Sequence, residues 1–261
     1  MDIAGLINPL YILSGLLVGF VVGLTGVGGG SLMTPILVLL FGVHPVTAVG
    51  TDLLYASATK AVGTAMHRVG GTIDWGVAGL LASGSIPATA LTLFVLRKLG
   101  VEGGDGLITT ILGAALVVTA LAVMCRRWIV TYAARIRGKD DPRRTRALTI
   151  VTGAVLGALV SATSVGAGAL GVTALIVLYP GLSTARIVGT DIAHAVPLTL
   201  VAGLGHWLIG SVDVLIIVSL LLGSVPGIVA GSFLAPRVPD GALRPILAIV
   251  LAVVGVRLLF R

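Results

Sequence analysis

Long apolar stretches separated by short polar turns make up almost the whole chain. The first half has them at residues 3–24, 32–41, 45–67, 75–96 and 106–125, and the second half at residues 148–164, 170–179, 183–207, 212–235 and 243–260. A helix of about 20 apolar residues can cross a bilayer, whereas one of about 10 cannot. The pattern predicts an all-α polytopic membrane protein of two homologous halves, each with a broken or re-entrant helix followed by three spanning helices.

The composition agrees with this prediction. Hydrophobic residues make up 57% of the chain and charged residues 10%, and the mean hydropathy is +1.13. These values lie outside the usual range of soluble domains. The single cysteine, Cys125, excludes a disulfide within the chain.

The one long polar run, residues 126–146, carries eight of the 17 Lys and Arg residues. A net charge of +7 could suit a nucleic-acid partner, but a basic loop in a multispanning protein usually marks the cytoplasmic side. We therefore interpret it as a cytoplasmic linker in a protein of the cytoplasmic (inner) membrane, with no nucleic-acid partner. It divides a first transmembrane repeat, residues 1–125, from a second, residues 147–261.

The two halves repeat each other in sequence. A shift of 139 residues places residues 50–52 (Gly-Thr-Asp) on residues 189–191, which are also Gly-Thr-Asp. The same shift matches four further pairs: His67 with His206, Gly71 with Gly210, Asp74 with Asp213, and Ser85 with Ser224. A shift of 138 matches Thr25 with Thr163 and residues 27–30 with residues 165–168. Internal duplication of this kind is typical of secondary transporters, in which two repeats enclose a site near the midplane.

The orientation of the halves follows from the length of their first two segments. Residues 1–41 would form a helix of about 60 Å, too long for one crossing, so these segments either cross twice or form a re-entrant hairpin. Both alternatives leave an odd number of crossings in each half, which predicts inverted repeats with both termini outside. With Lys60 left aside as buried, this arrangement puts twelve basic residues inside and four outside, and a parallel arrangement gives eleven and five.

A glycine-rich stretch interrupts the apolar sequence of the first half. Four of the five residues 26–30 are glycine, and each would weaken a helix by about 1 kcal/mol. Irregular backbone inside hydrocarbon persists only where protein buries it or where it lines a watery cavity. We predict a helix that breaks and restarts, with free N–H groups that favour an anion. The alternative is close helix packing through small residues.

Three motifs carry a family resemblance: GxxxGxxGVGGGxxxxP at residues 19–35, GxxPxxAxGTD at residues 42–52 and HxxxGxID at residues 67–74. They resemble the sulfite exporter TauE/SafE family of membrane permeases, and the second half repeats them more loosely, with Ala167 at a glycine position. The resemblance implies a transporter of small sulfur-containing anions, such as sulfite, sulfonates or organosulfonates, across the cytoplasmic membrane.

The candidate substrate-binding residues lie at the two breaks and at polar positions of the third segment of each half. Glycines let the backbone approach a ligand, hydroxyls donate hydrogen bonds, and Lys60 is the one basic residue deep in an apolar run. Two facing helix starts would suit a tetrahedral sulfonate or sulfite. The set is Thr25, Gly28, Gly29, Gly30, Ser31, Thr51, Lys60, Thr163, Ser164, Gly166, Gly168 and Thr190.

The candidate coupling or gating residues are Asp52, Asp191, His194, His67 and His206. If the third segment begins at its proline, Asp52 lies about 10 Å along the helix, and an acidic group at that depth suggests a function such as proton coupling. The alternatives are that each aspartate caps a broken helix or pairs with a basic residue, and that Lys60 pairs with an aspartate or snorkels. His194 could titrate near neutral pH, and the other two histidines either gate or bond to the turns beside them.

Other classes of function lack a signal in the sequence. No HExxH pair, GxSxG elbow or cluster of cysteine and histidine ligands is present, so we expect neither an enzyme nor a cofactor or metal. A passive anion channel or an accessory membrane subunit stays open as an alternative to a carrier. The expected partners are a small anion, protons and the lipid bilayer, and a homo-oligomer is compatible with the sequence.

Overall fold

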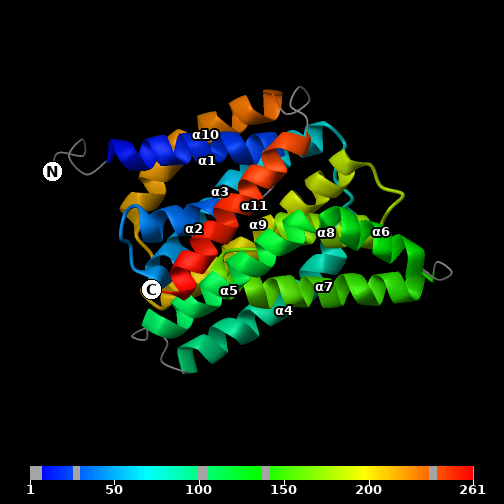
Figure 1. The fold of residues 1–261 in the computed structure, drawn as a ribbon, viewed down its shortest axis with the longest axis horizontal. Coiled ribbons are helices and arrows are strands. Elements are labelled where there is room, and N and C mark those ends of the chain that lie inside the picture. The colour runs from blue at the N-terminus through cyan, green and yellow to red at the C-terminus, as the bar shows by residue number, and fades with distance from the viewer. Residues whose placement is uncertain (1–7, 26–29, 99–104, 137–140, 235–239, 261) are drawn as a thin grey trace.

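A computed structural model describes residues 8–25, 30–98, 105–136, 141–234 and 240–260, and the regular structure in these ranges is entirely helical (Figure 1). The helices of the first half and the linker are α1 (Pro9–Thr25), α2 (Gly30–Leu39), α3 (Pro45–Val69), α4 (Trp75–Lys98), α5 (Asp105–Met124) and α6 (Arg126–Ile136). Those of the second half are α7 (Pro142–Thr163), α8 (Ala169–Leu178), α9 (Thr184–Leu208), α10 (Val214–Leu234) and α11 (Asp240–Leu259).

Each predicted apolar segment corresponds to one helix, which confirms the all-α prediction. Within the described ranges, α4, α7, α9 and residues 214–231 of α10 are long and apolar enough to cross a membrane. The linker differs from its prediction as a polar loop because two of its parts are helical. Residues 126–136 form α6, and α7 begins inside the linker at Pro142, where the side chain of Asp141 accepts a hydrogen bond from the N–H of Arg143 at 2.9 Å.

Each half opens with a helical hairpin. The second helices of the two hairpins, α2 and α8, have 10 residues each and are about 15 Å long, half the thickness of the hydrocarbon core. The rings of Tyr11, at the start of α1, and Phe41, after the end of α2, are 4.3 Å apart between centroids. The hydroxyls of Thr149, near the start of α7, and Tyr179, after the end of α8, are hydrogen-bonded at 2.8 Å. Both hairpins therefore return to the face from which they started, which favours the re-entrant alternative over two crossings.

The third helices of the two halves, α3 and α9, pack together and run antiparallel. Two matching hydrogen bonds connect the start of each helix to the turn after the other. Thr51 Oγ1 accepts from the N–H of Asp213 at 3.0 Å, and Thr190 Oγ1 accepts from the N–H of Asp74 at 2.9 Å. The two contacts correspond under the same 139-residue shift that relates the sequences.

The remaining long helices pair across the halves, α1 with α10, α4 with α7 and α5 with α11. Glycines bring these pairs close: a Cβ added at Gly84 of α4 would overlap the carbonyl oxygen of Ile150, and one added at Gly153 of α7 would overlap that of Leu81. Small residues at such positions allow close van der Waals packing in lipid, where the hydrophobic effect does not drive helix association. The halves are consequently interleaved, since a long helix of each one packs against the other.

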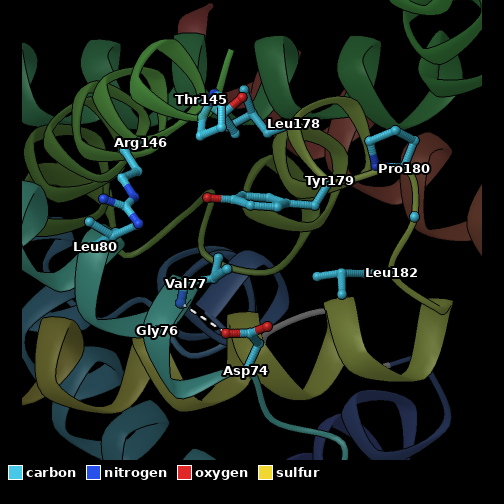
Figure 2. A pocket seen from close by; sticks show the side chains of 12 residues that line it. Asp74, Gly76, Val77, Leu80, Thr145, Arg146, Leu178, Tyr179, Pro180 and Leu182 are labelled. Atoms are coloured by element: carbon cyan, nitrogen blue, oxygen red, sulfur yellow. Dashed lines mark hydrogen bonds between the residues drawn. The ribbon is translucent and has the colours of Figure 1, made fainter. Parts of the chain in front are cut away.

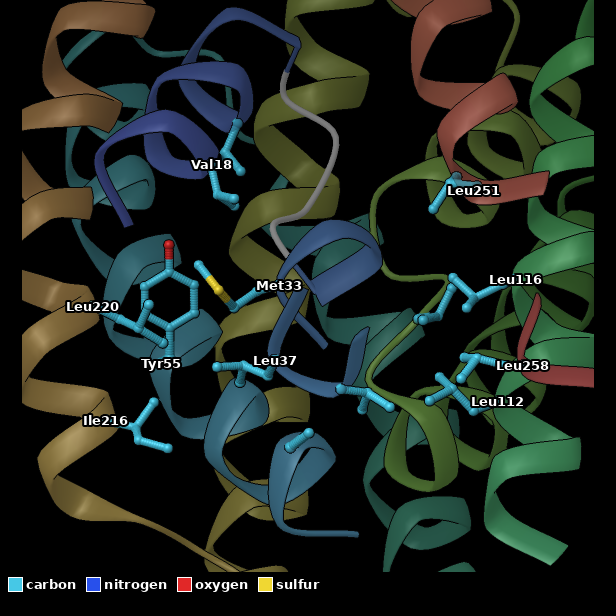
Figure 3. Close-up of a cluster of buried hydrophobic side chains, with 14 of the residues drawn as sticks. Val18, Met33, Leu37, Tyr55, Leu112, Leu116, Ile216, Leu220, Leu251 and Leu258 are labelled. Atoms are coloured by element: carbon cyan, nitrogen blue, oxygen red, sulfur yellow. The ribbon is translucent and has the colours of Figure 1, made fainter. Parts of the chain in front are cut away.

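The short helix α2 is anchored by a large apolar cluster that joins α1, α2, α3, α5, α10 and α11 (Figure 3). Met33 and Leu37, one turn apart on α2, are completely buried in it beside Tyr55 of α3 and Leu220 of α10. This packing fixes the rotation of α2 about its axis. As a result the neighbouring Thr34 is held against Asp52 of α3.

Candidate functional site

The break in the second half lies between α7 and α8 and is formed by residues 164–168. Ser164, Gly166 and Gly168 have φ angles of 57°, 112° and 113°, a region that side chains disfavour and that glycine adopts without strain. Thr163 Oγ1 donates to the carbonyl of Leu159 at 2.7 Å and accepts from the N–H of Val165 at 3.1 Å, so it caps the end of α7. All of these residues are buried, which confirms the predicted interruption inside apolar sequence.

The break in the first half separates Thr25, the last residue of α1, from Gly30, the first residue of α2. Gly28 and Gly29 lie outside the described residues, as do the side chains of Thr25 and Ser31. Their role in binding substrate stays a prediction.

Asp52 connects the two interrupted elements. Its side chain is completely buried, and Oδ2 accepts hydrogen bonds from the hydroxyl of Thr34, from the N–H of Thr34 at 3.1 Å and from the hydroxyl of Ser164 at 2.9 Å. One carboxylate oxygen thus contacts the middle of α2 and the residue that follows α7. The other oxygen, Oδ1, has no hydrogen-bond partner among the described residues. Oδ2 therefore joins the two interrupted elements, whereas Oδ1 stays available, and the choice between a capping and a coupling role stays open.

Asp191, the counterpart of Asp52 in α9, is equally buried but has different surroundings. Neither of its carboxylate oxygens has a hydrogen-bond partner in the described part of the chain. Its side chain lies against Gly171 in the first turn of α8, where an added Cβ would overlap Oδ1. The two equivalent carboxylates thus differ in how many hydrogen bonds they accept.

Lys60 brings a positive charge to this acidic interior. It lies on α3 eight residues after Asp52, its side chain is buried, and it interacts electrostatically with both Asp52 and Asp191. A carboxylate from each half and one amino group therefore share the region beside the two breaks. Burying an unpaired charge costs free energy, and charged residues that persist inside membrane helices usually mark a functional site.

His194 completes the buried polar group, and two residues in or beside it were not predicted. His194 lies one turn after Asp191, and its Nε2 is 2.9 Å from the hydroxyl oxygen of Ser85 on α4, whereas Nδ1 has no hydrogen-bond partner among the described residues. Sequence analysis missed Ser85 and Thr34 as site residues. Their recurrence was a usable signal, because the 139-residue shift matches Ser85 with Ser224 and Thr34 with Thr173.

The other two histidines lie 15 residues, or about 22 Å, from the aspartate of their own helix. Because α3 and α9 are antiparallel, each lies beside the other half's Gly-Thr-Asp segment, His206 against Gly50 and His67 against Gly189. His67 Nδ1 is 2.8 Å from Thr72 Oγ1, a contact within the turn between α3 and α4. His206 Nε2 is 2.9 Å from the carbonyl oxygen of Ser161 and connects α9 to α7. These contacts hold each histidine to a neighbouring turn or helix, and its role in coupling or gating stays a prediction.

A cavity of about 730 Å³ lies where α4 and α7 begin and α8 ends, on the side of the basic linker (Figure 2). Figure 2 shows Arg146 and the phenol of Tyr179 entering it from one side and Asp74 from the other. Asp74 forms an ion pair with Arg186 at 3.9 Å. The sequence did not predict this cavity.

The fold and the buried charges define a helical membrane protein with interrupted helices at a polar interior, an arrangement typical of transporters. The chain belongs to the Sulfite exporter TauE/SafE family, whose sequence model matches residues 11–258, as the motifs had suggested.

Similar proteins carry the same general description. The "Probable membrane transporter protein YjnA" of Bacillus subtilis is 41% identical over 251 residues, which are 95% of this chain and 98% of that protein. YdhB of the same organism, also named a probable membrane transporter protein, is 27% identical over 96% of this chain and all of its own length. A "Probable membrane transporter protein" of Xylella fastidiosa is 27% identical over 86% of this chain and 83% of its own length. No solved structure matches the chain.

Proposed function

We propose that the protein is a secondary active transporter of small sulfur-containing anions, such as sulfite, alkyl sulfonates or other organosulfonates, and that it couples their movement to protons. The observation that carries the proposal is the buried group of Asp52, Asp191 and Lys60 beside both helix breaks. The family name supplies the substrate class. Family membership and the absence of catalytic sequence motifs both speak against an enzyme.

The anion binds between the two breaks, close to Lys60. The amino group provides the positive charge, and the N-terminal turns of α2 and α8 provide N–H groups that favour an anion. Ser164 and Thr34, which now donate to Asp52, are hydroxyl donors that can turn to a bound oxyanion. Protonation of Asp52 would release those donors, which links proton binding to anion binding.

The two halves are inverted with respect to the membrane in this proposal. The antiparallel packing of α3 against α9 supports it, as does the return of each hairpin to the face where it began. Inverted repeats of this type allow one half to rock against the other around a fixed site. The basic linker lies in the cytoplasm of the cell, and the membrane is the cytoplasmic (inner) one.

The test is transport by purified protein in proteoliposomes. Sulfite, methanesulfonate and benzenesulfonate, with acetate as a carboxylate control, are offered with and without an imposed pH gradient. We expect saturable uptake of at least one sulfur anion that the pH gradient accelerates. A current that does not saturate and ignores the gradient would instead identify an anion channel, and absence of transport of every sulfur anion would refute the proposed substrate class.

A further inference from the structure

A second cavity, of about 460 Å³, lies between α5, α6, α7 and α8. It is lined by apolar groups with few exceptions, among them Ala122 of α5, Ile129 of α6, Leu148 and Val155 of α7 and Ala174 of α8. The cavity of Figure 2 is lined by an earlier part of α7, with Thr145 and Arg146, and it shares Leu178 with the apolar one. The two cavities therefore differ in position and in chemistry, and we call the apolar one the α5–α8 cleft.

The α5–α8 cleft faces the surroundings of the helix bundle. Three of the side chains that line it on α7, those of Leu148, Val151 and Val155, are exposed. In a membrane-spanning helix, exposed aliphatic side chains lie in hydrocarbon. The occupant of the cleft is consequently an apolar chain that reaches it from the bilayer.

Helix α6 closes one end of the cleft and has the properties of an interfacial helix. Its 11 residues span about 16 Å, too short to cross the membrane. Trp128 and Tyr132 are 83% and 65% exposed, while Ile129 lines the cleft. Tryptophan and tyrosine concentrate at the level of the lipid headgroups, and short basic amphipathic helices lie in that plane.

Basic residues lie at the end of the cleft that α6 closes. Arg144 is exposed and lies one turn before Leu148, on the face of α7 that continues through Leu148 and Val155 into the cleft. The linker from residue 126 to residue 146, which includes α6, carries eight basic residues and two acidic ones. Basic groups beside an apolar cleft between membrane helices complement an anionic headgroup.

We propose that the α5–α8 cleft binds one acyl chain of an anionic phospholipid whose phosphate is held by Arg144 at the level of α6. The site is separate from the anion site of the proposed function. Its ligand is a phospholipid of the surrounding bilayer, which binds beside the linker helix α6. The lipid fills the cleft between the linker helix and the second hairpin, α7–α8.

Native mass spectrometry of the delipidated full-length protein tests the site. The protein is titrated with phosphatidylglycerol and with phosphatidylcholine carrying the same acyl chains. We expect tighter retention of phosphatidylglycerol, and we expect Arg144→Gln to reduce that preference about fivefold, the factor for one basic residue near an anionic surface. Ala174→Phe fills the cleft and abolishes retention of both lipids at this site.

Control variants outside the cleft distinguish lipid binding in the α5–α8 cleft from lipid binding elsewhere on the surface. Arg97→Gln removes an exposed charge from the far end of α4, and Leu222→Phe enlarges an exposed apolar residue of α10; both should bind lipid as the wild type does. If Ala174→Phe fails to fold, Thr152→Phe, which enters the cleft from α7, replaces it. Equal retention of the two lipids, unchanged retention in the filled variant, or a second copy of the chain in place of lipid would each overturn the proposal.

Discussion

At the scale of single residues, the main finding is the asymmetry between two aspartates that the sequence makes equivalent. Asp52 has one oxygen that accepts three hydrogen bonds, whereas Asp191 has no hydrogen-bond partner among the described residues. The two equivalent carboxylates therefore differ in the hydrogen bonds that they accept, although both interact with Lys60.

Replacing Asp52 tests the coupling role. Asp52→Asn should leave the protein folded and remove the response of transport to an imposed pH gradient, because an amide cannot exchange a proton. The measurement is the initial rate of uptake into proteoliposomes over a series of pH gradients, with Asp141→Asn as a control at an exposed acidic residue. A pH response like that of the wild type would remove Asp52 from the coupling role.

Lys60 should matter for both stability and binding. Lys60→Met removes the cation that, among the described residues, acts on both buried carboxylates, and breaking a buried charged set costs about 3–5 kcal/mol. We expect a lower unfolding temperature and at least a tenfold weaker affinity for the transported anion.

The double variant Lys60→Met/Asp191→Asn distinguishes the two roles of Lys60. It should recover part of the stability, since it removes a carboxylate together with its counter-charge, but none of the affinity. Thermal unfolding in detergent and anion titration measure the two effects separately. Wild-type stability and affinity in the single variant would show that Lys60 acts on neither.

At the scale of elements, glycine determines how close the long helices lie. The pairs α1–α10 and α4–α7 meet through glycines that exclude a Cβ, while Gly79 of α4 faces open space. Close packing through small residues was the alternative for the glycines of the predicted breaks, and the structure shows such packing at Gly84 and Gly153 of the long helices. It does not explain Gly166 and Gly168, whose φ angles form the break itself.

Two glycines of α4 provide a matched test of this packing. Gly84→Ala should destabilise the protein by about 1–3 kcal/mol, because the methyl group meets the backbone of α7. Gly79→Ala adds the same atom where nothing lies within 4 Å, and it should be neutral or slightly stabilising. The difference between the two unfolding temperatures is the measurement, and equal temperatures would contradict the packing argument.

At the scale of the whole molecule, long helices of each half pack against long helices of the other half. Contacts between them recur under the shift that relates their sequences, as in the pair Thr51–Asp213 and Thr190–Asp74. A rearrangement of one half consequently changes an equivalent set of contacts in the other. This is the property that alternating access requires of two repeats.

The inverted orientation can be tested with equivalent positions at the N-caps of α3 and α9. His44 and Ser183 are exposed and correspond under the 139-residue shift. In a Cys125→Ser background, His44→Cys and Ser183→Cys should react with a membrane-impermeant thiol reagent from opposite sides of the membrane, Ser183→Cys from the cytoplasm. Labelling of both from one side would show that the repeats are parallel.

Hydropathy and duplication were sufficient to predict the helices and their interruptions. The burial of individual polar residues could also be predicted, since Asp52, Asp191 and Lys60 are all buried, as their apolar neighbours indicate. The contacts of Thr34 were missed because they depend on the rotation of α2, which a distant apolar cluster sets. Helix α6 was missed because the basic run that contains it was interpreted as a loop, although the helix is amphipathic, as suits a helix at an interface.

The pairing of α1 with α10 has a consequence for biogenesis. The glycine-lined surface of α1 leaves the ribosome early, yet its partner surface, around Gly223 and Gly227, is synthesised only near the end of translation. Until then the insertion machinery, a chaperone or lipid must shield α1, and the first hairpin cannot reach its final place. Chains that stop before α10 should therefore be recognised by membrane quality control and degraded, even when every earlier span has been inserted.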